Sequence, residues 1–453
     1  MQSAIDYLVS AGGEFVEFFF ESSRTHSILI EDSRVERISS GTDEGFGLRI
    51  VSDERTAYGF SNKLGPDEMY RLGRDVLESL ERGRGESIAL GRLERSRTAG
   101  LVRPAVSVPM EEKVALVYAA DRAARAVGEE ISQVQITYSD KVQSIQIYNN
   151  EGTAVDDERH YALFFVKAIA TDGTDLQTAY RSLGGTVGFE IFDSGRPVEL
   201  AAEAGESALM VLHARRSPAG TMAVVLGSQA GGTMIHEAIG HGLEGDTAEK
   251  GLSIYSGKIG EPVASAQITV IDDATMVGKR GSFSFDDEGV PARRTVAVEE
   301  GILKGYLLDR MTAKKLGSVS TGNGRRQSFR HRPIVRMSNT MIAPGTHDPQ
   351  EIVASVDYGL CVLRMGGGQV DTSSGDFVFK ANEAYLIEGG KMTEPVRGAT
   401  LIGNGPAILH TIDMVGNDIG FDIGTCGKDG QHVPVADAQP TLRIPAITVG
   451  GEV

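Results

Sequence analysis

The stretch GGTMIHEAIGHGLEGD, residues 231–246, contains two histidines and a carboxylate around which the rest of the chain can be organised. His236 and His241 offer imidazoles, the commonest side-chain ligands of a catalytic divalent metal, zinc above all. Glu237 directly follows the first histidine. A carboxylate in that position can take a proton from a metal-bound water and pass it to a leaving group. The stretch therefore predicts a metal-dependent hydrolytic site, and a buried helix with two incidental histidines is the alternative.

The spacing of the two histidines is HExxxH, which is one residue longer than the HExxH of the familiar metalloprotease helix. At about 100° per residue, the fifth step on a regular α-helix lands roughly 140° away from His236, off the shared face. We therefore expect either a local π-type turn or a helix that ends near Gly240, with His241 pointing back from the exit. Gly240 and Gly242 flank His241, and glycine permits such an irregular backbone.

Length, charge and cysteine content are those of a soluble intracellular enzyme. The 453 residues suffice for roughly two or three domains. With 45 Lys and Arg against 62 Asp and Glu, the net charge of −17 argues against nucleic acid or an anionic membrane as the main partner. The N-terminus lacks the basic region of a signal peptide, and no run of about 18 apolar residues predicts a membrane span. Two cysteines without a disulfide framework favour a reducing compartment, so a cytoplasmic location is expected.

Hydrophobic periodicity predicts separate groups of strands and helices in the first half of the chain. Strand-like segments occupy residues 15–22, 26–31, 34–39, 45–51, 55–60, 131–139, 142–149 and 162–171. Helical segments occupy residues 3–10, 66–81, 109–127 and 197–213, and residues 81–103 resemble a charged linker. Short turns between the first strands predict an antiparallel meander, and the segregation of strands from helices predicts an α+β fold.

The second half of the chain is dominated by β-like segments and glycine turns. A buried strand at residues 222–226 is expected to lead into the histidine stretch, and further strands are expected at 268–272, 295–298, 303–308, 359–365, 377–387 and 400–402. The predicted organisation is a set of N-terminal antiparallel meander-plus-helix modules followed by a large β-rich C-terminal domain that carries the metal-site helix. The expected domain ranges are 1–95, 105–213 and 214–453.

The two cysteines have different surroundings. Cys361 lies in the apolar run GLCVLRM, which favours a plain core thiol. Cys426 lies in FDIGTCGKDGQ, between two glycines and near Lys428, and this setting predicts an exposed, flexible loop whose positive charge favours the thiolate. A catalytic metal held by two histidines needs a third protein ligand. The candidates are Cys426 and its rivals Glu244, Asp246, His410 and His432.

His331 and a cluster of arginines lie in RRQSFRHRPIVRMSN, in an otherwise acidic protein. Such a cluster can hold a substrate carboxylate or stabilise an oxyanion, and His331 and Arg336 are therefore candidate substrate-binding residues. The alternative is a solvated face whose arginines, at 325, 326, 330, 332 and 336, pair with surplus acids. The acidic run at residues 286–288, in SFSFDDEGVP, could bind a cation, but a solvent-exposed turn without a ligand is expected.

A glycine run offers bare backbone to a peptide. Gly366, Gly367 and Gly368 lie in MGGGQVDTSSGDF, beside a predicted strand. Glycine lets another chain approach closely, and an unpaired strand edge can accept an extended peptide as an added strand. These three glycines are therefore further candidate substrate-binding residues.

Three stretches, HEAIGHGLEGD, SFSFDDEGVP and IGTCGKDGQ, together resemble the TldD/PmbA family of metallopeptidases, and the intact HExxxH resembles its TldD branch. The resemblance runs over nearly the whole chain. It implies zinc ligands at His236, His241 and Cys426 and a catalytic glutamate at Glu237. It also implies small or unfolded peptides as substrates, and a dimer that is either a homodimer or a heterodimer with a PmbA-type subunit.

Together these inferences predict a cytoplasmic zinc peptidase in which a zinc-activated water is the nucleophile and Glu237 is the general base. The alternative is a non-catalytic partner-binding or regulatory subunit whose metal is structural. Three protein ligands plus water indicate catalysis, whereas four protein ligands indicate a structural site.

Overall fold

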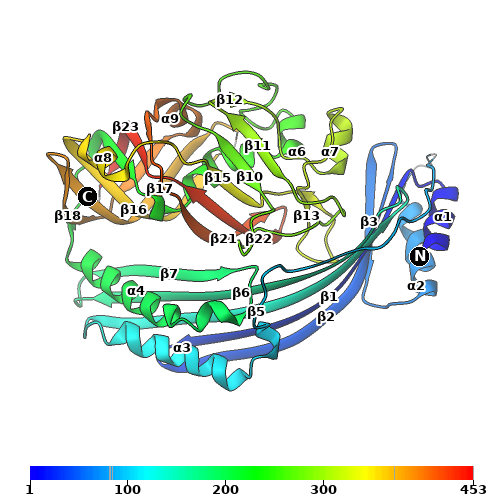
Figure 1. The fold of residues 1–453 in the computed structure, drawn as a ribbon, viewed down its shortest axis with the longest axis horizontal. Helices are drawn as coiled ribbons and strands as arrows, with labels where there is room; N and C mark the ends of the chain where they lie inside the picture. The colour runs from blue at the N-terminus through cyan, green and yellow to red at the C-terminus, as the bar shows by residue number, and fades with distance from the viewer. Residues whose placement is uncertain (81–82, 84, 372, 452–453) are drawn as a thin grey trace.

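A computed structural model of the protein describes residues 1–80, 83, 85–371 and 373–451. The predicted α+β class is confirmed, because helices and sheets form separate layers (Figure 1). The end of the predicted helix at residue 81 and parts of the predicted linker, at 82 and 84, lie outside the described residues, as do residue 372 of the glycine-run stretch and residues 452 and 453. None of the described helices is long and apolar enough to cross a membrane.

The N-terminal half forms one seven-stranded sheet in the order β3-β2-β1-β5-β6-β4, with β7 also pairing with β6. The strands are β1 (Phe15–Glu31), β2 (Arg34–Ser52), β3 (Arg55–Ser61), β4 (Glu94–Arg97), β5 (Ile131–Asn149), β6 (Ala154–Thr171) and β7 (Leu176–Gly185). Every pairing is antiparallel except that of β4 with β6. Strands from the predicted ranges 1–95 and 105–213 share this sheet, and the boundaries themselves stay a prediction.

Several predicted strands are wrong in length, because pairs of them are single long strands. Residues 15–22 and 26–31 both belong to β1, residues 34–39 and 45–51 to β2, and residues 131–139 and 142–149 to β5. β1 pairs with β2 along its whole length and with β5 from Glu17 to Glu31. The polar residues in its middle stay extended because neighbouring strands on both sides satisfy their backbone hydrogen bonds.

Helices cover one face of this sheet and the C-terminal half covers the other (Figure 1). The helices of the first half are α1 (Gln2–Ser10), α2 (Pro66–Leu77), α3 (Met110–Arg125) and α4 (Arg196–His213). Apolar residues of α3 and α4, such as Val117 and Ala204, share a core with Phe164 of β6. On the opposite face, Phe19 of β1 packs with Phe285 and Phe329 of the C-terminal half. The two halves are therefore joined by an apolar contact.

The C-terminal half contains an eight-stranded sheet that closes on itself. Its strands are β8 (Arg215–Arg216), β9 (Gly220–Leu226), β16 (Tyr358–Val370), β17 (Asp376–Glu388), β18 (Lys391–Arg397), β19 (Thr400–Asn404), β20 (Met414–Val415) and β23 (Leu442–Gly450). β16 pairs with both β9 and β17, and the path β9-β23-β19-β17 completes the ring. Buried residues of these strands, including Leu226, Phe379 and Ile444, share one core.

A second, six-stranded sheet in the order β12-β11-β10-β15-β22-β21 lies beside this ring (Figure 1). Its strands are β10 (Val270–Asp273), β11 (Arg294–Glu299), β12 (Ile302–Leu303), β15 (Asn339–Ile342), β21 (Gly420–Lys428) and β22 (Gln431–Gln439), and β13 (Gly324–Arg325) pairs with β14 (Ile334–Val335). The remaining helices are α5 (Thr233–Ile235), α6 (Gly245–Glu249), α7 (Arg310–Lys315), α8 (Pro349–Ala354) and α9 (Gly405–Thr411). The predicted strand at 303–308 is largely wrong, because residue 303 ends β12 and Leu307 makes only an isolated bridge, with Glu244.

Candidate metal centre

The histidine stretch forms an irregular helix of three short parts. α5 is followed by a π-helix, His236–Gly240, and by a 3-10 turn, His241–Leu243. The backbone N–H of His241 donates to the carbonyl of His236, five residues earlier. In a π-turn the fifth residue lies one turn further on the same face, so the two imidazoles meet with ring centroids 4.9 Å apart. Of the two predicted geometries, the π-type turn is confirmed.

Close packing explains the glycines in this helix. A Cβ on Gly240 would lie 2.2 Å from Sδ of Met337, and a Cβ on Gly242 would lie 2.6 Å from the ring of Tyr255. The Tyr255 hydroxyl donates to the carbonyl of Ala238 (3.2 Å), which gives the irregular helix a partner for that carbonyl. A larger side chain at either glycine would push the helix away from its neighbours.

Cys426 completes a compact group with the two histidines. Its Sγ lies 3.2 Å from Nε2 of His236 and 3.5 Å from Nε2 of His241. The prediction of an exposed, flexible loop at Cys426 is wrong, because the residue lies within β21 and is 4% exposed. The hairpin register pairs Cys426 with Val433, and Val335 and Met337 pack in the same cluster.

The spacing of the three donor atoms fits a tetrahedral zinc ion. For Zn–N of about 2.0 Å and Zn–S of about 2.3 Å, tetrahedral donors lie roughly 3.5 Å apart. The two N–S distances match this value, and one ligand atom from each of the three residues lies within 4.8 Å of the others. Two imidazole nitrogens and a thiolate are also the donor types that zinc prefers.

Two carboxylates fix the orientation of the imidazoles. Nδ1 of His236 lies 2.7 Å from Asp437 Oδ1, and Nδ1 of His241 lies 3.0 Å from Glu244 Oε2. A carboxylate accepts hydrogen bonds, so each Nδ1 carries a proton, and loss of the Nε2 proton would leave a lone pair directed toward the Cys426 sulfur. Carboxylate–histidine pairs of this kind are typical of metal-ligating histidines.

Electrostatics favour the charged forms of these groups. Burial by itself would raise the pKa of Cys426, but hydrogen bonds from the two histidines lower it to about 5. Burial would lower the pKa of His241, but Glu244 and the Cys426 sulfur raise it to about 10. The pKa of His236 is raised well above its usual range, because the attraction of Asp437 outweighs the effect of burial. A thiolate among buried carboxylates is a strong attractor of a cation, and binding of a metal would release the imidazole protons.

The rival third ligands have other contacts. The carboxylate of Glu244 accepts a hydrogen bond from His241 Nδ1. Burial would raise the pKa of Glu244, but the attraction of His241 and Lys428 lowers it to about 2. Asp246 pairs with Lys428 at 2.6 Å. His432 is exposed on β22, and His410 lies on α9. Within the described part of the chain, His236, His241 and Cys426 form the one metal-sized group of at least three such residues.

Glu237 is the carboxylate that directly follows His236. Glu237 is half-buried within the π-helix, and no described residue donates a hydrogen bond to its carboxylate. This carboxylate is therefore free to bond to water or substrate.

Cys361 is 2% exposed, and burial raises the pKa of its thiol to about 12. Its prediction as a core thiol is confirmed.

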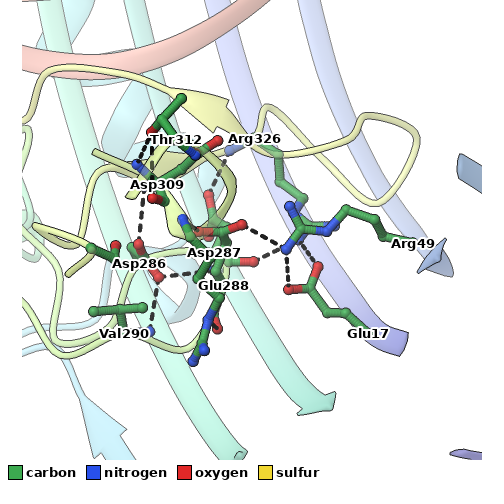
Figure 2. Close-up of polar contacts among 12 residues, drawn as sticks. Glu17, Arg49, Asp286, Asp287, Glu288, Val290, Asp309, Thr312 and Arg326 are labelled. Atoms are coloured by element: carbon green, nitrogen blue, oxygen red, sulfur yellow. Dashed lines mark hydrogen bonds and ion pairs between the residues drawn. The ribbon is translucent and has the colours of Figure 1, made fainter. Parts of the chain in front are cut away.

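The acidic run at residues 286–288 is buried, and the prediction of a solvent-exposed turn there is wrong. Asp286, Asp287 and Glu288 are 0%, 3% and 0% exposed. Figure 2 shows that Arg49 of β2 lies between Glu17 and Glu288, at 2.9 and 2.6 Å. Asp286 instead accepts backbone N–H groups, including that of Val290 at 2.9 Å. The run joins the two halves of the molecule, which local sequence cannot reveal because its basic partners Arg49 and Arg159 come from β2 and β6.

The arginine cluster is also mainly buried. Arg325, Arg326 and Arg336 are buried, so the solvated-face alternative is wrong for these three, whereas Arg330 and Arg332 are exposed. Arg336 donates to the carbonyls of Cys426 and Gln431, and thereby supports the strand that carries the thiol. Nδ1 of His331 lies 3.1 Å from Oγ of Ser328. Substrate binding by Arg336 and His331 stays a prediction.

The glycine run lies on β16, one edge of which has no partner among the described strands at the run. β16 pairs with β17 as far as Val370, but with β9 only from Gly359 to Val362. Gly367 and Gly368 are exposed, and a Cβ on Gly366 would lie 2.4 Å from Asn382 Oδ1. Arg364, just before the run, donates to the carbonyl of Gln229. The run therefore begins close to the turn that precedes α5.

Comparison with known proteins gives the family. Sequence models of the PmbA/TldA metallopeptidase family match domain 1 at residues 16–83, the central domain at 103–212 and the C-terminal domain at 219–451. The chain belongs to the PmbA/TldA metallopeptidase family. Its relatives include TldD homologs: the Haemophilus influenzae "Metalloprotease TldD homolog" is 38% identical over 97% of this chain and 93% of its own. The Saccharolobus solfataricus "Zinc metalloprotease TldD homolog" is 26% identical and covers 98% of both chains.

Solved structures share the fold of this PmbA/TldA chain at low sequence identity. TldE from Thermococcus kodakarensis superposes with a TM-score of 0.76 at 19% identity, over 99% of this chain and all of that one (100%). A Thermotoga maritima protein, described as a candidate modulator of a DNA gyrase, superposes with a TM-score of 0.82 at 22% identity, over 99% of this chain and 100% of that one. At these identities the likeness concerns the fold.

Replacement of Asp437 by asparagine is expected to weaken zinc binding by this TldD-branch protein about 10–100-fold. The asparagine amide can present its NH₂ to Nδ1 of His236 and thereby favour the wrong tautomer, while the three donor atoms stay in place. The measurement is the zinc Kd by competition with a chromogenic chelator. Asp413→Asn, which alters an exposed pair with Arg443, is the matched control. An unchanged Kd in Asp437→Asn would contradict the positioning role.

Proposed function

We propose that this protein is a zinc-dependent peptidase that cleaves small or unfolded peptides. The observation that carries the proposal is the group of His236, His241 and Cys426, whose donor atoms have zinc spacing. Asp437 and Glu244 hold the two histidines in the ligating tautomer. The metalloprotease names of the relatives support the same reaction class.

The residues around the site can perform hydrolysis. Zinc held by the three residues would make water more acidic and polarise a peptide carbonyl. Glu237, whose carboxylate is free of described partners, accepts the proton of the attacking water and returns it to the departing amine. Cys426 must stay reduced to ligate, which fits a cytoplasmic enzyme.

An extended peptide fits the surroundings of the site. The unpaired edge of β16 at the glycine run can add a peptide strand, since exposed backbone there lacks a neighbour among the described strands. Gly366, Gly367 and Gly368 would allow close approach, and His331 and Arg336 stay candidates for substrate contact. A folded domain cannot offer a free strand without local unfolding.

The second candidate function is a non-catalytic regulatory subunit with a structural metal. It requires a fourth protein ligand. Glu244 and Asp246 already bond to His241 and Lys428, so neither is free to close the shell. The catalytic proposal is therefore favoured.

The enzyme is proposed to work as a dimer, either a homodimer or a heterodimer with a PmbA-type subunit. The shared fold of TldE supports such a pairing of similar chains. The ligands expected are peptides, with neither nucleic acid nor membrane involved.

We expect unstructured peptides to be cleaved and a stable folded domain to resist. The test incubates the protein, alone and with a PmbA-type subunit from the same source, with both substrate types and follows fragments by mass spectrometry. Cleavage should stop with a chelator and return with zinc. Equal digestion of the folded control would contradict the substrate class, and chelator-insensitive cleavage would contradict the metal.

A further inference from the structure

A cavity of about 290 Å³ lies between the N-terminal sheet and the hairpin of β21 and β22. Tyr161 of β6 lines one side, and Arg325 and Thr425 line the other. Thr425 immediately precedes Cys426 on β21, and side chains of successive strand residues point to opposite faces. The cavity therefore contacts the face of β21 opposite the one that carries the thiol, and it is separate from the metal centre.

Two cations that line this cavity form no ion pair with a described residue. Arg325 is 4% exposed, and its Nη1 and Nη2 donate to the carbonyls of Met337 (2.5 Å) and Pro434 (2.7 Å). The Nε of partly buried Arg280 donates to the carbonyl of Gly424 (3.2 Å). Among the described residues, no carboxylate oxygen lies within 4.0 Å of either guanidinium. Buried charges are normally paired, because an unpaired charge is costly to remove from water.

The other basic residues of the cavity are already neutralised. The pairs are Arg159 with Asp287 (2.7 Å), Arg326 with Glu17 (2.5 Å) and Lys141 with Glu21 (3.3 Å). The excess positive charge of the cavity therefore comes from Arg280 and Arg325. Burial lowers the pKa of both groups, and the attraction of Asp287 offsets this effect only in part at Arg325. This local excess is notable in a chain of net charge −17.

The remaining lining suits an oxyanion attached to an organic body. Tyr161 is buried, and its hydroxyl forms no hydrogen bond with a described residue. Leu163 adds apolar wall, as does Pro434, which pairs with Thr425 and shares its face of the hairpin. Gln327 and His432 are exposed lining residues through which the cavity can open to solvent. The volume is many times the roughly 30 Å³ share of one water molecule, so a bare inorganic ion would leave most of it unfilled.

We propose that the cavity between Arg280 and Arg325 is an oxyanion-binding site for a small organic ligand that carries a carboxylate or phosphate group. Planar guanidinium groups bind both anions through paired N–H donors. The Tyr161 hydroxyl supplies a further donor. The site does not depend on peptide hydrolysis. An occupant would contact β21 through Thr425, from the side opposite the metal ligands.

Calorimetric titration with glutarate, inorganic phosphate and neutral glutaramide tests the site. We expect saturable 1:1 binding of at least one of the two anions and none of glutaramide. Tighter binding of glutarate would identify carboxylates as the ligand class, and tighter binding of phosphate would identify phosphate esters. Arg280→Gln should weaken the preferred anion at least about tenfold, the typical effect of losing a charged hydrogen bond. Arg325→Gln should do the same where it folds.

Two controls separate this site from other anion binding. Arg330→Gln alters an exposed arginine of the same segment, which pairs with Asp43, and should leave the affinity unchanged. Cys426→Ser should also bind the anion normally, which excludes chelation at the metal centre. Absence of saturable anion binding by the wild-type protein, equal affinity in Arg280→Gln, or loss of binding in Cys426→Ser would each overturn the proposal.

Discussion

Glutamine at position 237 is expected to lower kcat for peptide hydrolysis by about 10²–10⁴-fold, the usual contribution of a general acid–base group. The amide of glutamine cannot accept the proton of the attacking water, yet it has nearly the same size as the carboxylate. Glu237 is half-buried, and its carboxylate accepts no hydrogen bond from a described residue. Its replacement should therefore leave the fold and the three donor atoms in place.

The Glu237→Gln measurement pairs steady-state kinetics on an unstructured peptide with zinc content by elemental analysis. Glu261→Gln, at an exposed carboxylate, is the matched control and should keep full activity. Loss of zinc in Glu237→Gln would mean that the carboxylate is a ligand. Full activity in this variant would contradict the peptidase mechanism.

Serine at position 426 is expected to abolish measurable peptidase activity and to weaken zinc binding. The loss of affinity should exceed the roughly 10–100-fold expected when a residue that only hydrogen-bonds to a ligand, such as Asp437, is replaced. The sulfur lies 3.2 and 3.5 Å from the two Nε2 atoms, so it is central to the donor group. A serine hydroxyl stays protonated near neutral pH and is a poor zinc ligand, whereas the pKa of Cys426 is about 5.

Cys361→Ser is the matched control for Cys426→Ser. Its thiol is buried among apolar residues such as Val225 and Ile387, so serine there should reduce stability while zinc content is retained. The measurements are the zinc Kd and thermal unfolding of both variants. Equal zinc affinity in wild type and Cys426→Ser would contradict the ligand assignment.

Sequence reasoning predicted the features that depend on neighbours within a few residues. The helices at 66–77, 110–125 and 196–213 follow from apolar residues at helical spacing, since burial of one helix face is a local pattern. The spacing of His236 and His241 likewise predicted an irregular helix, either a π-type turn or an end near Gly240, because a regular helix cannot bring residues five apart onto one face. The structure has the π-type turn.

The tertiary structure decided the features that depend on distant partners. Asp437 reaches His236 across 201 positions, and its only local signal is a carboxylate within an apolar strand. The sequence around Cys426 resembles a glycine loop, yet pairing with β22 and packing against Met337 bury it. The same holds for the acidic run, in which arginines from other segments pair with Asp287 and Glu288. The types and spacing of the two histidines proposed as metal ligands can therefore be predicted from the sequence, because helix geometry is local. Their burial, protonation and outer partners come from strand register, which brings together segments that no local pattern connects.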